Sequence, residues 1–416
     1  MLQNTRHNPN NAGFPNGTIK GTICIDCDQV IGGAERIGDG WKMLMECLAV
    51  GRGVSLPATA NGSSKLITHS IMHYINIRKQ FNMKIGNMEA VREKFVDMYL
   101  NTWIIHTSVR FTNHILDTGS TPSVITAIMK QQTTERARTV LNHGMDIYAG
   151  SGICTGANNF FTPFYHSSPV GITVEGSNTL TRGLIIFGQG LNKSHPHIFP
   201  IFESIQENNL LSFQTHINRL VASAVVNYCA VLWRGCTVSS SPHARLELAT
   251  LQFSVLANCV ALLGGRIKSK QMISGNMADI VSNLYLAYSV LWYYKHHQEK
   301  SETSSLLRDE CLFYLLNELD VKMNAVVANY PLPFVRRLLY PMTNRMRHEN
   351  WDEKNRLYKL IVGDAGLHAL FKDDIYYRDT VLEKMETLRK MNENTDEYNA
   401  LYQDIISVGE YPLHHE

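Results

Sequence analysis

At 416 residues the chain is longer than a typical single domain, so two or three packed regions are expected. Hydrophobic residues make up 44% of it and charged residues 18%, and this composition excludes a disordered or fibrous protein. The 39 basic side chains nearly balance the 37 acidic ones, so the net charge of +2 argues against a dedicated nucleic-acid-binding protein.

The cysteine content and the start of the chain predict a cytoplasmic location. Eight cysteines over this length do not form a dense disulfide framework, and no basic start followed by an apolar stretch resembles a secretory signal. The longest apolar runs, Arg219–Arg234 and Thr250–Gly265, are shorter than a bilayer-spanning helix. No integral membrane span is therefore predicted, and peripheral attachment to the inner membrane stays open.

In chain order, residues 1–33 come first. They are rich in Asn, Gly and Pro, and they hold one short β-type run at Thr18–Cys27. A stable sheet needs several strands with a common buried face, so this segment is too short to be a domain. We interpret it as a remnant of a larger β-structure.

Helical patterns predict a bundle over residues 34–195. Apolar residues recur at three- and four-residue steps after Gly40, and the first helix is marked by Trp41, Leu44, Met45 and Leu48. Further helices are predicted at Ser63–Gln80 and Met88–Leu116. The run Thr121-Pro122-Ser123 has the cap and the early proline that begin a fourth helix, which ends near His143. Long helices with short connections favour an antiparallel bundle.

The rest of the chain is also predicted to be helical. Asp146–Pro200 is rich in Gly, Asn, Ser and Pro, which predicts loops and one short helix inside the bundle region and just beyond it. Helical periodicity then returns, with apolar stripes at Leu248–Leu262 and Met277–Leu291. Residues 196–416 are therefore predicted to form a helical C-terminal extension, and the fold class is all-α.

Glu175 stands apart because so few charges surround it. No Asp, Glu, Lys or Arg lies between Asp146 and Glu175, and the next charged residue is Arg182. A carboxylate in such an apolar, glycine-rich setting is a candidate general base for carbon acids. The alternative is a helix-start Glu that free backbone N–H groups stabilise, and spacing alone does not separate the two.

Four segments carry a resemblance to a known family. They are Gly32–Arg52, Arg78–Phe81, Asp146–Gly152 and Val174–Ser177. Their order and spacing resemble the C-terminal helical domain of flavin-dependent acyl-CoA dehydrogenases. The sequence is most similar to the long bacterial fatty-acid β-oxidation form, which carries a further helical C-terminal region like residues 196–416. The resemblance implies that residues 1–33 belong to the end of the middle β-domain.

The resemblance implies a reaction and a catalytic residue. Glu175 matches the glutamate that removes the α-proton of the acyl thioester while a hydride leaves the β-carbon for the flavin. The family holds the thioester carbonyl with the backbone N–H of this Glu and a ribityl hydroxyl of the flavin. Gly176 would let the chain pass close to substrate and cofactor. Ser177 and Thr179 stand where the family places flavin contacts, although Thr179 replaces a common Gln.

The resemblance also implies FAD as the cofactor and positions that hold it. Arg78 and Phe81 match a stretch that reaches the flavin of the neighbouring subunit, and Gln80 stands within it where a hydroxyl residue is common. An Arg suits a pyrophosphate because it forms bidentate contacts. The alternative for Arg78 is a cation that ends an amphipathic helix. Gly150 matches a glycine that the family keeps next to the flavin, while Asp146 replaces the Gln that usually precedes the glycines.

Two further positions depart from the family pattern or match it in part. Ala149 replaces the first of two paired glycines, so the adenine contact is altered or lost. Arg52 matches a position that contacts coenzyme A, but Ala49 stands where many members have Asp. A surface Arg without a ligand is the alternative for Arg52.

Two functional classes follow from the resemblance. The family's N-terminal helical domain and most of its β-domain precede the point that matches Met1, so most of the flavin cradle is expected to come from elsewhere. In the first reading a truncated or split enzyme dehydrogenates fatty acyl-CoA to trans-2-enoyl-CoA in β-oxidation. It would act as a homo-oligomer with electron-transfer flavoprotein, and a separate chain is one source of the missing half. In the second it is an inactive helical scaffold.

Other motifs are predicted to have structural roles, and no metal site is predicted. Gly150–Gly156 lacks the βαβ unit of a dinucleotide fingerprint, and Cys24 and Cys27 lack a second ligand pair. His69 and His73 share a helix face at metal-ligand spacing, but no third ligand stands near them in the sequence. Basic and apolar residues alternate between Phe334 and Arg347, which fits a solvated helix face or contact with an anionic membrane.

Overall fold

The computed structural model describes residues 2–7, 10, 13, 16–120, 122–237, 239 and 241–407, with the backbone alone for 41, 42 and 44–50. Thr121 and the side chains of Trp41, Leu44, Met45 and Leu48 lie outside the described part. The chain forms two compact units. The first unit contains residues 1–102, 133–175 and 358–416, and the second contains 103–132 and 176–357. These are bodies in space rather than stretches of sequence, so the boundaries at 33 and 195 stay a prediction.

The N-terminal residues form a small exposed hairpin. Strand β1 (Leu2–Thr5) pairs antiparallel with β2 (Gly17–Lys20), with Leu2 opposite Lys20 and Thr5 opposite Gly17. The strand predicted to reach Cys27 ends at Lys20 because β1 offers only four pairing residues. Two short 3₁₀ turns follow, η2 (Cys27–Gln29) and η3 (Ala34–Arg36).

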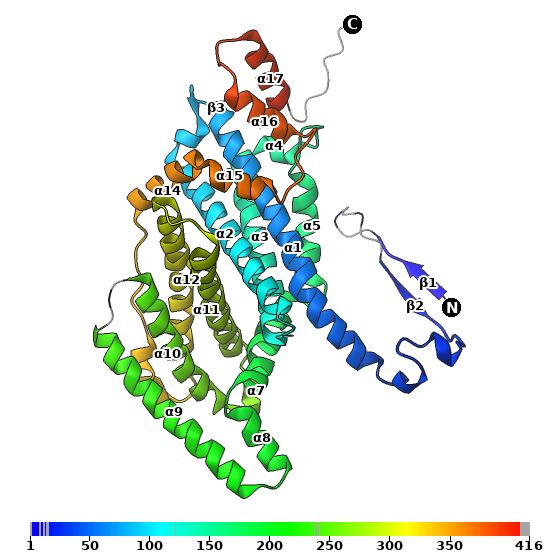
Figure 1. The fold of residues 1–416 in the computed structure, drawn as a ribbon, viewed down its shortest axis with the longest axis vertical. Helices are drawn as coiled ribbons and strands as arrows, with labels where there is room; N and C mark the ends of the chain where they lie inside the picture. Colours follow the sequence, from blue (N-terminus) through cyan, green and yellow to red (C-terminus); the bar gives the residue numbers. More distant parts are fainter. Residues whose placement is uncertain are drawn as a thin grey trace. The chain divides into compact units, whose positions relative to one another are not determined.

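The described chain is otherwise almost entirely helical, which confirms the all-α prediction (Figure 1). The next elements in chain order are α1 (Gly40–Ile77), the hairpin β3 (Lys79–Gln80) and β4 (Met83–Lys84), η4 (Ile85–Asn87), α2 (Glu89–Asp117), α3 (Ser123–Tyr148), α4 (Gly150–Ile153) and α5 (Thr162–Thr173). The two helices predicted before Gln80 are one continuous helix, α1. Neither the glycines near Arg52 nor Pro57 ends it, since a single proline removes only one helical hydrogen bond.

The core of the first unit holds these helices together. In α1 the Thr68 hydroxyl lies 2.8 Å from that of Thr102 in α2, and both side chains are buried. Gly144 of α3 allows Phe161 and Ile67 to approach closely, because an added Cβ would lie 2.7 Å from the Phe161 ring. The C-terminal helices α15 (Ala365–Lys372) and α16 (Val381–Lys390), orange to red in Figure 1, pack on α1, and α17 (Asp396–Ile406) packs on α16.

The second unit is built around two long helices, α11 (Gln271–His297) and α12 (Glu302–Ala328), which pack side by side. Its other elements are α6 (Asn178–Leu180), η5 (Thr181–Gln189), α7 (Gly190–Ser194), α8 (Ile198–Gln206), α9 (Leu210–Thr237), α10 (Pro242–Ala261), η6 (Gly264–Lys268), α13 (Pro333–Leu338) and η7 (Tyr340–Met342), and α14 (Trp351–Gly363) runs out of this unit. The sequence predicted loops and one short helix for Asp146–Pro200, and this prediction was wrong because the stretch is mainly helical. Its short segments form helical turns because nearby backbone groups satisfy one another, and η5 is a π-helix.

Helix α9 differs from the other long helices in its exposure. It lies along α10 (green in Figure 1), and Val221, Val226 and Trp233 are 57%, 65% and 74% exposed. Within the described residues it is the one helix whose length and hydropathy would allow it to cross a membrane, and only 6% of its most apolar window is buried. The sequence predicted no span because its apolar run Arg219–Arg234 is too short, but the helix begins at Leu210, well before Arg219.

Candidate functional site

The Glu175 turn is held in an unusual backbone conformation. It follows α5, and Glu175 and Gly176 both have positive φ angles, of 54° and 96°. A positive φ is uncommon for a residue with a side chain, and such strain is found mostly at functional positions. Glu175 is half-buried, and its Oε2 atom is buried without a hydrogen-bond partner in the described structure. Glu175 is therefore not a helix-capping carboxylate bound to backbone N–H groups through that oxygen.

A buried lysine holds the second half of the same turn. Lys130 of α3 is fully buried, and its Nζ donates to the Gly176 carbonyl at 2.6 Å and to Asn178 Oδ1 at 2.7 Å. The Thr181 hydroxyl also lies 3.4 Å from the Gly176 carbonyl. Sequence reasoning missed Lys130. Its signal was a lone cation within the apolar part of α3, which rarely stays buried unless it is paired.

Ser177 and Thr179 are exposed and belong to the second unit. Ser177 precedes the single turn of α6, and the π-helix η5 begins at Thr181. Arg182 of η5 is anchored by two hydrogen bonds to Asp279, at 2.6 and 2.5 Å, and this pairing raises the pKa of Arg182. The segment after Glu175 is thus held by two side chains of the second unit, Lys130 of α3 and Asp279 of α11.

Four of the predicted flavin contacts, Arg78, Gln80, Phe81 and Gly150, line one cavity in the first unit. This Arg78 cavity has a volume of about 550 Å³, and its lining includes Tyr74, Arg78, Gln80, Phe81, Lys94, Asp146, Tyr148 and Gly150. Arg78 is half-buried just after α1, while Phe81 is 87% exposed at the tip of the β3–β4 hairpin. Phe81 and Asn82 both have positive φ angles, as a two-residue hairpin turn requires.

The walls of the Arg78 cavity are aromatic and mildly cationic. The Tyr74 and Tyr148 rings meet edge to face with centroids 4.6 Å apart, and burial raises the pKa of both phenols. Asp146, which departs from the family pattern, forms an ion pair with Lys94. Its negative charge is therefore partly compensated, and Arg78 remains as a cation on the wall. An added Cβ on Gly150 would meet nothing within 4 Å.

A second, apolar cavity lies between α1, α3 and α5. This Phe164 cavity has a volume of about 220 Å³ and is lined by Leu56, Ala60, Leu141, Phe164 and Val170, among others. Arg52 lies one helical turn before Leu56. It is buried, at 7% exposed, and its Nε has no hydrogen-bond partner among the described residues. This finding contradicts the alternative of a surface Arg, because a buried guanidinium without a full set of partners is costly.

Ala149 carries backbone strain where the family pattern has glycine. Its φ of 51° with ψ of −130° is a conformation that a residue with a Cβ avoids. Ala149→Gly should therefore raise the free energy of unfolding by about 1 kcal/mol, measured by urea denaturation. Ala58→Gly on the exposed side of α1 is the control of opposite sign, because glycine inside a helix costs about 1 kcal/mol. A loss of stability in Ala149→Gly would contradict the assigned backbone.

The cysteine pair, the basic segment after α12 and the histidine pair of α1 lie in different surroundings. Cys24 and Cys27 are exposed free thiols in an irregular segment. Phe334 and Tyr340 are each 73% exposed on and after α13, beside Arg336 and Arg337. His69 and His73 are buried in α1 and meet a carboxylate from α16, which the sequence could not show.

Comparison with known proteins gives two family matches. The family described as "Acyl-CoA dehydrogenase, C-terminal domain" matches residues 38–188, and the one described as "Acyl-CoA dehydrogenase, C-terminal, bacterial type" matches residues 192–410. Among curated proteins, acryloyl-CoA reductase (NADH) of Anaerotignum propionicum is 29% identical over 115 residues, which are 28% of this chain and 29% of the reductase. Protein HemX of Proteus mirabilis is 46% identical over 61 residues, 14% of this chain and 36% of HemX.

Solved structures share the fold at low sequence identity. An acyl-CoA dehydrogenase complexed with FAD from Bacillus anthracis superposes with a TM-score of 0.63 at 20% identity, covering 78% of this chain and 57% of that one. Acyl-CoA oxidase 1 from Yarrowia lipolytica gives 0.56 at 14%, covering 89% and 55%. The chain thus spans little more than half of these structures and about a third of the curated relatives. Since the bacterial-type match alone covers more than half of the chain, the protein belongs to the acyl-CoA dehydrogenase family and carries its C-terminal helical region.

Proposed function

We propose that this chain supplies the catalytic base and part of the cofactor site for flavin-dependent dehydrogenation of a fatty acyl-CoA to the trans-2-enoyl-CoA. The observation that carries the proposal is Glu175, whose unpartnered buried Oε2 stands on a strained turn. A carboxylate oxygen without a donor is available to accept a proton, and its fixed turn limits where that proton can come from. Glu175 would take the α-proton of the thioester.

The Phe164 cavity and Arg52 support an acyl-CoA as substrate. The surface of the cavity is mainly apolar, although serine and threonine residues also line it, and this suits part of an acyl chain. The buried Arg52 lies one turn away along α1, and its partly unsatisfied guanidinium suits an anionic group. An acyl-CoA joins these two chemistries in one molecule, since it has a long apolar tail and a phosphate-rich head.

The Arg78 cavity supports FAD as the cofactor. Its aromatic walls, the half-buried Arg78 and the open space beside Gly150 fit part of a dinucleotide that carries a pyrophosphate. Bound there, the flavin would accept the hydride that leaves the β-carbon. Phe81 projects from its hairpin and is 87% exposed, which suits contact with another polypeptide. We propose that the rest of the cradle comes from such a polypeptide in a homo-oligomer or a two-chain assembly, with electron-transfer flavoprotein as the oxidant.

Flavin retention tests this proposal through Arg78. We expect the full chain, purified with a polypeptide that covers the family's β-domain, to show flavin absorbance. Arg78→Ala should raise the dissociation constant of FAD about 10- to 100-fold, because a charge-assisted contact worth about 1.5–3 kcal/mol is lost. Absorbance after gel filtration over a range of FAD concentrations measures this change.

The exposed Arg219 of α9 provides the matched control, and Arg219→Ala should retain flavin as the unaltered chain does. Added FAD should restore binding in Arg78→Ala. If the unaltered assembly takes up neither FAD nor acyl-CoA, the chain is a helical scaffold of this family rather than half of an enzyme.

A further inference from the structure

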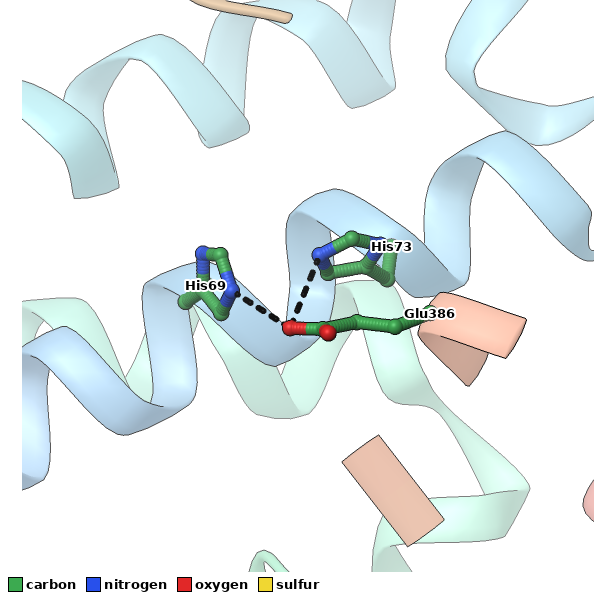
Figure 2. A group of neighbouring side chains, drawn as sticks. All are labelled: His69, His73 and Glu386. Atoms are coloured by element: carbon green, nitrogen blue, oxygen red, sulfur yellow. Dashed lines mark hydrogen bonds and ion pairs between the residues drawn. The ribbon is translucent and has the colours of Figure 1, made fainter. Parts of the chain in front are cut away.

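A cluster of side chains distant from the Glu175 turn joins the family bundle to the C-terminal extension within the first unit. His69 and His73 lie one turn apart on α1, and their rings meet edge to face with centroids 4.7 Å apart. Figure 2 shows Glu386 reaching from α16 toward both rings. Its Oε1 lies 3.2 Å from His69 Nε2 and 3.9 Å from His73 Nε2. The third ligand that the sequence lacked is therefore supplied by a residue 317 positions after His69.

We propose that His69, His73 and Glu386 bind a divalent transition-metal ion of the Zn²⁺ class, which links α1 to α16. Two imidazoles and one carboxylate form a ligand set that zinc accepts, with the fourth position left for water. The three ligand atoms all lie within 4.8 Å of one another. Around a tetrahedral zinc ion such atoms stand roughly 3.3 Å apart. The 3.2 Å pair already fits, and the other two separations, of 3.9 Å and at most 4.8 Å, require a side-chain adjustment of up to roughly 1.5 Å at His73.

Both histidines are buried, and the ring of His73 offers an unpartnered nitrogen. His69 and His73 are 2% and 6% exposed, and His73 Nε2 has no hydrogen-bond partner in the described part of the chain. Burial, with His69 and Arg389 nearby, lowers the pKa of His73 to about 2, so the ring is neutral. A metal ion at Nε2 would give this buried ring nitrogen a partner.

Glu386 is an ionised ligand. Burial alone would raise its pKa, but hydrogen bonds with His69 and Lys372 lower it to about 2. Lys372 Nζ contacts the other carboxylate oxygen, Oε2, at 2.5 Å, so Oε1 remains directed at the histidines. Lys372 would therefore orient the ligating carboxylate through its non-ligating oxygen.

Arg389 sets the affinity. Its Nη1 lies 3.2 Å from His73 Nδ1, and because a guanidinium only donates, the neutral ring must carry its proton on Nε2. A metal ion at Nε2 displaces that proton, the ring becomes protonated at Nδ1, and the Arg389 guanidinium must turn away. Arg389 and Lys372 also repel a cation. We therefore expect a dissociation constant on the order of micromolar, well above that of a structural zinc finger.

The test uses the full chain after removal of metals with a chelator. Cobalt(II) serves as the spectroscopic probe, and zinc is then measured by competition and by isothermal titration. One ion per chain should bind, and His73→Gln should weaken its binding at least tenfold, because one of three ligands is lost. His73→Gln leaves the Glu386 contacts with His69 and Lys372 in place, so the fold should persist, which circular dichroism checks.

Two further variants separate a built site from casual binding. His243 and Glu247 form an exposed pair on α10, 3.8 Å apart, without a third ligand, so His243→Gln should bind as tightly as the unaltered chain. Arg389→Gln should bind at least tenfold more tightly, because the amide oxygen accepts from the Nδ1 proton and a positive charge is removed.

Equal affinity in His73→Gln and His243→Gln would overturn the proposal, as would affinity no better than millimolar in both the unaltered chain and Arg389→Gln. The Arg389 variant keeps the proposal testable if His73→Gln does not fold. All of these measurements are independent of flavin and of catalysis, so they neither depend on the proposed enzymatic function nor decide it.

Discussion

Glu175→Gln should abolish α-proton abstraction in the assembled protein, and it should lower the rate at which acyl-CoA bleaches the flavin by about 10²- to 10⁴-fold. The amide is nearly isosteric with the carboxylate, so the turn should keep its fold and its ligands, but an amide has no useful basicity. Stopped-flow absorbance of the flavin after mixing with acyl-CoA measures the effect, and equilibrium binding of acyl-CoA should change little.

The matched control for this substitution is Glu207→Gln, at the exposed end of α8, which should bleach at the unaltered rate. Bleaching by Glu175→Gln as fast as by Glu207→Gln would show that another group takes the proton. That group would lie outside residues 147–181, where Glu175 is the one carboxylate, and the strained turn would then need a different explanation.

Lys130→Met should destabilise the protein and slow the reaction together. Lys130 Nζ is bonded to the Gly176 carbonyl and to Asn178 Oδ1, and Asn178 is buried. Methionine fills the space but leaves both acceptors without this donor, and hydrogen bonds to a charged group contribute about 1.5–3 kcal/mol each. We expect the free energy of unfolding, measured by urea denaturation, to fall by about 3 kcal/mol.

The same substitution frees the turn that carries Glu175, so the bleaching rate should fall about 10- to 100-fold. Lys193→Met, an exposed lysine at the end of α7, is the control and should stay within about 0.5 kcal/mol of the unaltered stability. If Lys130→Met matched Lys193→Met in both measurements, the position of the turn would not depend on Lys130.

The long helices could be predicted from the sequence because their signals are local. Apolar residues at three- and four-residue steps gave α2 and α3 to within a few residues at most of their ends. The same rule failed at the glycines near Arg52 and at Pro57, where two helices were predicted instead of one. The failure is physical, since a local breaker costs a few kcal/mol and the packing of a 38-residue helix can outweigh it.

The candidate site divides in the same way. Arg78 and Phe81 lie close in sequence and line one cavity with Gly150, so a linear motif sufficed to find them. The partners of Gly176 and His73 did not follow from any motif. Lys130 precedes its acceptor by 46 residues and Glu386 follows His69 by 317, and only the folded chain brings such groups together.

The π-helix η5 has a consequence for how this region tolerates changes in length. A π-turn holds more residues than an α-turn, so the nine residues Thr181–Gln189 accommodate extra backbone without a break in the helix. Deleting one residue there would let the segment return to α-helical geometry with little rotation of the segments on either side, whereas the same deletion in an α-helix turns everything before it by about 100°. The length of this segment can therefore change by one residue while the Gly176–Asn178 backbone keeps nearly the same direction.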